Sequence, residues 1–203
     1  MDLLLFTGFI LTSIAFIVIP GPNVLVVVAT SLQAGKRRGF QTVIGTSLAM
    51  LLQLAVALLA TSGLLVVLNV GLMWLKWAGV AYLAVLGVRA LLQLRRPEEK
   101  PQPTALGSLQ RGFWISLTNP KTILFFSAFL PQFVSPAGDA VTQLLVLSAT
   151  FWCLAITLDS CYVLLADRLR WLWSSRRGNK ALNGITGSVY LTASALLAST
   201  NKA

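Results

Sequence analysis

Long apolar runs separated by short basic clusters are the feature of this sequence that most restricts its fold. About 20 residues of α-helix cross a hydrocarbon core of roughly 30 Å, and runs of about this length or more recur along the chain. Only 11% of the 203 residues are charged, whereas soluble domains carry roughly 25%. The sequence therefore predicts an all-α integral membrane protein with six transmembrane helices. Their approximate spans are Leu3–Gln33, Gln41–Gly63, Val70–Leu92, Gly112–Phe133, Val141–Ala166 and Leu182–Ala198.

The Lys and Arg residues are concentrated in alternate loops, and this predicts the orientation of the chain. The first, third and fifth loops hold 13 of the 16 basic residues. Because basic loops stay on the cytoplasmic side of a membrane, we expect both termini outside, in the periplasm or the extracellular medium. The expected location is the bacterial inner (plasma) membrane. The net charge of +10 does not indicate nucleic-acid binding, since the basic residues are not gathered on a polar domain that could fit a groove.

A proline-rich, charged segment at residues 95–108 divides the chain into two halves, 1–94 and 109–203. We interpret this segment as a cytoplasmic linker. Each half opens with a run that proline interrupts, at Pro20–Asn23 in the first half and at Asn119–Lys121 in the second. Because three spans per half is an odd number, the halves must have opposite orientations. The pattern predicts two inverted three-helix repeats with interrupted first and fourth helices, a plan in which the interruptions mark the substrate site.

Four polar residues from four different spans are expected near the middle of the membrane. Counted from the nearest predicted loop at about 1.5 Å per helical residue, Asn23, Lys121 and Asp159 lie roughly 13 to 16 Å deep. Gln53 lies about 18 Å deep on the same count. Half of the hydrocarbon core is about 15 Å, so the sequence predicts that these side chains converge.

The motif Pro20-Gly21-Pro22-Asn23 removes two backbone donors and leaves carbonyl groups without helical partners. A bilayer tolerates such a break only where protein or water covers it. One interpretation is a substrate site, in which free amides at a new helix start bind an anionic group. The alternative is a packing kink in which Asn23 caps the following helix.

Lys121, in the motif Asn119-Pro120-Lys121, is the residue to which we give most weight. A lone ammonium group at the bilayer centre costs about 3 kcal/mol or more, so it needs a partner. One hypothesis is that Lys121 binds a substrate carboxylate, with Asn119 and Pro120 shaping the break. The alternatives are an ion pair with Asp159 and a side chain that reaches back to the cytoplasmic face.

Asp159 would be a second costly charge inside the membrane. Three roles stay open for it: a proton carrier, a counter-ion for a substrate ammonium group, or a structural carboxylic acid that makes hydrogen bonds. Gln53 is a weaker candidate for the lining of the site, with a hydrogen bond between helices as its alternative role.

No pattern in the sequence indicates an enzyme, a cofactor or a metal site. Histidine is absent and the six acidic residues are scattered, so a metal cluster is not expected. Cys153 and Cys161 lie about 12 Å apart along one predicted helix, too far for a disulfide within it. No nucleophile–base pair is visible, and no phosphate-binding glycine loop supports ATP-driven pumping.

Small residues recur at helical spacing and predict close helix–helix contacts. They are Gly35, Gly39, Gly45 and Ala49 in the first half, Gly79 and Gly87 in the third span, and Gly184 and Gly187 in the sixth.

Three groups of residues along the chain form a pattern that is typical of one protein family. They are Pro20–Asn23 with Gly35–Gly39 and Gly45, then Leu75–Leu83 with Gly87, and finally Asn119–Lys121 through Phe125 and Phe126 to Leu130–Phe133. Together they resemble the lysine exporter (LysE/RhtB) superfamily over essentially the whole chain, and the branch that exports homoserine, threonine and leucine more than the branch for basic amino acids. The resemblance implies efflux of amino acids or their derivatives, driven by the membrane potential or the proton gradient.

The sequence departs from that pattern at two positions. Ala49 stands where relatives often carry a second glycine, and Gln53 stands where many carry a histidine. If that histidine handles protons in the relatives, proton coupling in this chain would fall to Asp159.

We therefore expect an alternating-access exporter of a small zwitterionic amino acid similar to threonine, homoserine or leucine. Lys121 and the amides at Pro22–Asn23 would bind its carboxylate, and Asp159 would receive its ammonium group or a proton. The alternatives are a cation or metal exporter of the same superfamily and a membrane scaffold without transport activity. The expected partners are the amino acid and the lipid bilayer, and the sequence leaves open whether the chain forms a homodimer.

Overall fold

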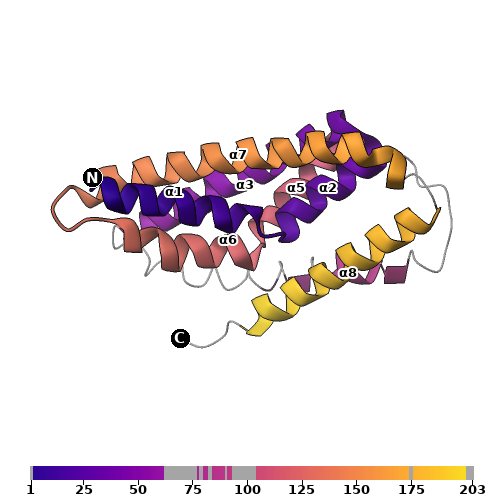
Figure 1. The fold of residues 1–203 in the computed structure, drawn as a ribbon. Helices are drawn as coiled ribbons and strands as arrows, with labels where there is room; N and C mark the ends of the chain where they lie inside the picture. Colours follow the sequence, from indigo (N-terminus) through magenta and orange to yellow (C-terminus); the bar gives the residue numbers. More distant parts are fainter. Residues whose placement is uncertain are drawn as a thin grey trace.

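The computed structural model describes residues 2–61, 77, 80–81, 84–89, 91–92, 104–173 and 176–199. All regular structure within these residues is helical (Figure 1), which confirms the expected all-helical class. The elements are α1 (Leu3–Val18), α2 (Pro22–Ala34), α3 (Lys36–Thr61), α5 (Ala105–Leu117), α6 (Pro120–Leu124), the π-helical turn η1 (Phe125–Phe129), the 3-10 turn η2 (Leu130–Phe133), α7 (Ala140–Trp173) and α8 (Arg176–Ser199).

Two of these helices are each long and apolar enough to cross a membrane, α3 over Lys36–Leu58 and α7 over Ala140–Trp171. α1 and α2 pass the same test as a bent pair and would add a third crossing. Most of the predicted third span, Val70–Leu92, and most of the linker at 95–108 lie outside the described residues. The arrangement of six spans in two inverted repeats therefore stays a prediction.

α1 and α2 meet at a bend of 51°. Ile19 and Gly21 each precede a proline, and proline disfavours the helical conformation in the residue before it. Both residues are extended, with φ −64° and ψ 119° at Ile19 and φ −129° and ψ −175° at Gly21. Pro22 then stands in the first turn of α2, where the missing N–H would have had no helical partner. The two prolines thus account for the position of the bend.

An extended residue before a proline also separates α5 from α6. Asn119 precedes Pro120 and is extended, with φ −73° and ψ 110°. Its side-chain oxygen accepts a hydrogen bond from the backbone N–H of Lys121 and so caps α6. α6 then continues into the π-helical turn η1 and the 3-10 turn η2, and such departures from α-helix often accompany functional sites.

The two ends of the bundle differ in charge. Figure 1 shows the amino terminus of α1 beside the loop that precedes α7, and Asp2 and Asp139 lie there. At the opposite end Gly35 makes the α2–α3 turn with φ 81°, a left-handed conformation that glycine adopts without strain. Next to it the backbone N–H of Lys36 donates to Asp167 Oδ1 of α7 at 3.0 Å. This second end, called the basic end below, carries Lys36, Arg37, Arg38, Arg168 and Arg170.

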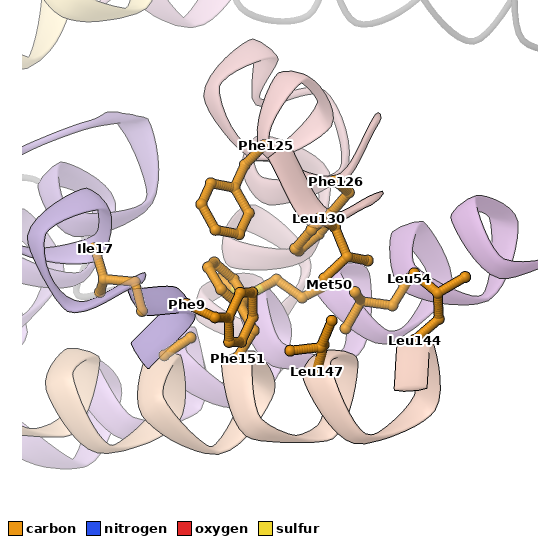
Figure 2. Close-up of a cluster of buried hydrophobic side chains, with 11 residues drawn as sticks. Phe9, Ile17, Met50, Leu54, Phe125, Phe126, Leu130, Leu144, Leu147 and Phe151 are labelled. Atoms are coloured by element: carbon orange, nitrogen blue, oxygen red, sulfur yellow. The ribbon is translucent and has the colours of Figure 1, made fainter. Parts of the chain in front are cut away.

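Buried aromatic and aliphatic side chains gather in one cluster inside the bundle (Figure 2). α1, α3, η1 and α7 all contribute to this cluster. Phe125 of η1 has no exposed surface, and its ring centroid lies 4.4 Å from that of Phe16 and 4.7 Å from that of Phe151. The aromatic packing therefore joins η1 to α1 and α7 at the level of the bend.

α3 and α5 cross in close contact at two glycines. A Cβ atom at Gly45 would collide with the backbone carbonyl of Leu109, and one at Gly112 would collide with the backbone of α3. A Cβ at Gly87 would lie 2.7 Å from Leu191 Cγ of α8. The predicted packing role of Gly45 and Gly87 is thus confirmed.

Candidate functional site

A buried hydrogen-bond network joins the two helix breaks. Asn119 Nδ2 donates to Asn23 Oδ1 at 2.9 Å, and Asn23 Nδ2 donates to Ser116 Oγ at 3.0 Å. Ser116 Oγ in turn donates to the backbone carbonyl of Thr46 at 3.2 Å. Because these side chains are almost completely buried, an unpaired amide would be costly. The network therefore holds α2 against α5 and α6 at a fixed point.

Lys121 extends from the start of α6 to the end of α1. Its Nζ donates to the backbone carbonyl of Phe16 and, at 2.5 Å, to that of Ile19. The same Nζ lies 4.4 Å from the centroid of the Phe16 ring. Tyr162 of α7 donates its hydroxyl to the carbonyl of Val18 at 2.9 Å. Carbonyls that lose helical partners at the break thus accept hydrogen bonds from side chains of two other helices.

Gly21 provides the room for this path of the lysine side chain. A Cβ atom there would lie 3.0 Å from Lys121 Cδ and 3.7 Å from its Nζ. The backbone of Gly21 is extended, a conformation open to any residue. The close contact with Lys121, and not the backbone conformation, therefore favours glycine at this position.

Asp159 projects from α7 toward the same place and is only 2% exposed. It is near enough to Lys121 for an electrostatic interaction. Within the described residues, however, no ion pair joins the two side chains, and no hydrogen bond to the Asp159 carboxyl group is found. The predicted structural ion pair is therefore not made in this conformation.

A cavity of about 30 Å³ lies between these groups. Gly21, Asn23, Asn119, Lys121 and Asp159 line it, together with Thr122 and the apolar residues Phe16, Ile17, Val24, Met50, Phe151 and Ala155. A water molecule needs roughly 10–15 Å³ measured in this way, so the cavity has room for water but not for an amino acid. A larger ligand would have to displace a side chain.

The first turn of α2 presents free amides to the cavity. Pro22 has no N–H, and Gly21 supplies no side-chain cap. The first helical hydrogen bond of α2 runs from Leu25 N to Gly21 O at 3.0 Å, so the N–H groups of Asn23 and Val24 have no acceptor within the helix. The break thus places carbonyl groups of α1 and amide groups of α2 around one small space.

Four of the predicted site residues do not line the cavity: Pro20, Pro22, Pro120 and Gln53. The prolines act through the backbone, as described above. Gln53 of α3 donates from Nε2 to the carbonyls of Ser116 at 3.0 Å and Leu117 at 3.1 Å. This is the hydrogen bond between helices that we gave as its alternative role.

Sequence reasoning missed Phe16, Ser116 and Tyr162. Phe16 stands four residues before Pro20, so the missing amide of that proline frees its carbonyl, and this signal could have been used. Ser116 and Tyr162 carry no such signal, because their partners Asn23 and Val18 lie on other helices.

In the part of the chain that the structure describes, no group of three or more Cys, Asp or Glu side chains is arranged to hold a metal ion.

Comparison with known proteins gives consistent matches over most of the chain. Residues 14–200 match the family model described as LysE type translocator. The chain is 29% identical to the homoserine/homoserine lactone efflux protein of Salmonella typhi, with 97% of each chain covered. It is 29% identical to the leucine efflux protein of Klebsiella pneumoniae, over 94% of this chain and 92% of that one, and 28% identical to an uncharacterized membrane protein of Vibrio cholerae over 98% of both. No solved structure matches.

Proposed function

This chain belongs to the LysE type translocator family, and we propose that it is a secondary transporter that exports a small zwitterionic amino acid from the cytoplasm. Relatives named as efflux proteins for homoserine, its lactone and leucine suggest the substrate class. Threonine, homoserine and leucine are the first substrates to test.

The observation that supports the proposal most is the pair of opposite helix ends at the bend between α1 and α2. The end of a helix that carries free carbonyls attracts cations, and the start that carries free amides attracts anions. An α-amino acid carries one group of each sign on neighbouring atoms. A gap between the two helix ends therefore suits the ammonium and the carboxylate of one molecule.

In the proposed complex, the substrate carboxylate accepts hydrogen bonds from the N–H groups of Asn23 and Val24 and from Lys121. The substrate ammonium donates to the carbonyls at the end of α1 and interacts with Asp159. Asp159 could alternatively take up a proton, since it faces the cavity without a hydrogen bond from any described residue. The apolar lining of Ile17, Met50 and Phe151 would contact the substrate side chain.

Alternating access would follow from the inverted repeats that the sequence predicts. In that prediction the first and second breaks occupy equivalent places in the two halves. The hydrogen bond between Asn23 and Asn119, at 2.9 Å, joins them directly. Relative rotation of the halves around this point would open the cavity to one side of the membrane at a time. The basic end of the bundle would face the cytoplasm, and both termini would lie outside the inner membrane. The driving force would be the membrane potential or the proton gradient.

Transport assays with matched charge variants test this proposal. Proteoliposomes loaded with labelled threonine, homoserine or leucine measure the rate of release for the wild type, Lys121→Ala and Asp159→Asn. Both variants should release the substrate at least about tenfold more slowly, because hydrogen bonds to charged groups contribute roughly 1.5–3 kcal/mol. Lys36→Ala and Asp139→Asn are the controls, since both side chains are exposed and distant from the cavity, and they should behave as the wild type.

Wild-type rates for both cavity variants would show that the assigned site is wrong. Release of labelled metal ions by the wild type, with no release of any amino acid, would favour the alternative of a cation exporter. Release of neither kind of substrate would favour the scaffold.

A further inference from the structure

The end of α1 has the properties of a binding site for a primary ammonium group. Two backbone carbonyls, those of Phe16 and Ile19, accept hydrogen bonds from the Nζ of Lys121. The face of the Phe16 ring lies 4.4 Å from that nitrogen, and aromatic faces attract cations. The partial negative charge at the carboxyl end of a helix adds to this attraction. An ammonium group from another molecule would find the same set of contacts.

Asp159 supplies a second, independent indication. It is buried, lines the same cavity and has no hydrogen bond among the described residues. A buried carboxyl group that accepts no hydrogen bond is costly, and a second cationic donor beside the end of α1 would supply one. Lys121 interacts electrostatically with this carboxyl group, but the hydrogen bonds of its Nζ go to the carbonyls of Phe16 and Ile19.

The lysine reaches this site from another helix. Lys121 belongs to α6, and its aliphatic chain passes over Gly21 before the ammonium group arrives at α1. The free amides at the start of α2, where a carboxylate would bind, border the same cavity. A rotation of the lysine side chain would therefore move its charge from the carbonyls of α1 toward those amides.

We propose that Lys121 occupies the subsite of the substrate ammonium and is displaced from it when the substrate binds. This inference rests on the proposed function and specifies how the site is filled. The incoming ammonium replaces Lys121 at the carbonyls of Phe16 and Ile19 and beside Asp159. Lys121 then turns to the carboxylate of the same substrate molecule. A zwitterion brings no net charge, so the total charge of the site stays constant and each buried charge keeps a partner.

This exchange selects for molecules that carry both an ammonium group and a carboxylate. A simple amine would displace Lys121 without giving it a new anionic partner, so the wild type should bind amines poorly. Removal of the lysine charge should open the subsite to them.

Binding of 3-methylbutylammonium, which is leucine without its carboxylate, tests the proposal. Calorimetry on purified protein in lipid nanodiscs would compare the wild type with Lys121→Met and with the exposed control Lys36→Met. The Lys121→Met variant should bind the amine about tenfold more tightly or better, a difference of roughly 1.4 kcal/mol. The control should match the wild type. Addition of the substitution Asp159→Asn to the Lys121→Met protein should remove most of the gain in amine affinity.

Uncharged 3-methylbutanol is the probe for a merely enlarged cavity. Equal gains for the alcohol and the amine in Lys121→Met, or equal amine affinity in the wild type and the variant, would overturn the proposal. If Lys121→Met does not fold, Lys121→Gln replaces it, because it also removes the ammonium group from the end of α1. Lys121→Gln should then gain amine affinity, whereas the exposed control Lys36→Gln should not; no gain in Lys121→Gln would count against the displacement.

The outcome is separate from that of the export assay. A gain in amine binding without amino-acid export would leave the ammonium subsite standing while the proposed function fails. Export without any gain in amine binding would remove this inference alone.

Discussion

At the scale of single residues, the two asparagines are the groups on which the site depends most. Asn23 and Asn119 each use both the oxygen and the nitrogen of the side-chain amide. Asn119 accepts a hydrogen bond from Lys121 N and donates one to Asn23. Asn23 in turn donates to Ser116. Amide side chains suit this position because they both donate and accept. An aspartate could not replace either residue without losing a donor and adding a buried charge.

The network gives a prediction about stability. Asn119→Ala should lower the free energy of unfolding by about 2–4 kcal/mol, because it removes the cap of α6 and also leaves Asn23 unpaired. Thr104→Ala is the matched control: Thr104 caps α5 by accepting from Gly107 N, but it is exposed and its side chain has no second partner among the described residues. Its loss should be about 1 kcal/mol. Denaturation in detergent micelles measures the free energy of unfolding of both variants. Equal losses of stability would contradict the role of the hydrogen bond between Asn23 and Asn119.

At the scale of helices, the crossing of α3 and α5 joins two segments that lie far apart in the sequence. Gly45 and Gly112 allow the two backbones to approach until a single Cβ would touch a carbonyl group. In a membrane, where burial of apolar surface gives little drive for association, such close packing is a main source of helix–helix attraction. The network at Asn23 and Asn119 lies beside this crossing, since Ser116 of α5 bonds to Thr46 of α3.

Alanine substitutions can separate helix propensity from packing here. Gly45→Ala should destabilise the protein by about 1–3 kcal/mol, because the added methyl group meets backbone that cannot move aside. Gly8→Ala in α1 should be neutral or stabilising by up to about 1 kcal/mol, as alanine favours a helix and the site has space. Thermal unfolding of the two variants gives the comparison. A neutral Gly45→Ala would show that the crossing is looser than described.

The positions of the breaks could be predicted from the sequence, but their partners could not. Proline acts on the residue directly before it, so Ile19, Gly21 and Asn119 are extended for local reasons. The contact of Lys121 with the end of α1 joins residues about one hundred positions apart in the chain, and no local rule specifies it. Depth alone predicts the convergence of Asn23, Lys121, Asp159 and Gln53. Gln53 does not line the cavity, because its side chain donates to two carbonyls of α5, and depth does not specify this direction.

At the scale of the whole molecule, the distribution of charge and the fold agree. The described basic loop residues gather at one end of the bundle and Asp2 and Asp139 at the other. Chain segments that are distant in sequence, such as the α2–α3 turn and the end of α7, meet at the basic end. This polarity leads us to expect a single orientation in the membrane.

Single cysteines test that orientation. Cys153 and Cys161 are exposed on α7 and unpaired, so both can be replaced by alanine to give a background without thiols. In this background Asp139→Cys should react with a membrane-impermeant maleimide on intact cells. Arg37→Cys should react only after the cells are made permeable. The opposite pattern would reverse the orientation, and labelling of the cysteine-free background would invalidate the assay.

The small size of the cavity has a consequence for the membrane potential of the cell. An energised membrane stores about 2.3 kcal/mol for each elementary charge at 100 mV, and a permanent bore through any protein would discharge it. A gap of about 30 Å³ that Phe16 and Phe151 help to line is far smaller than such a bore. Many copies of the protein that are not transporting could therefore be present in one membrane without dissipating its potential.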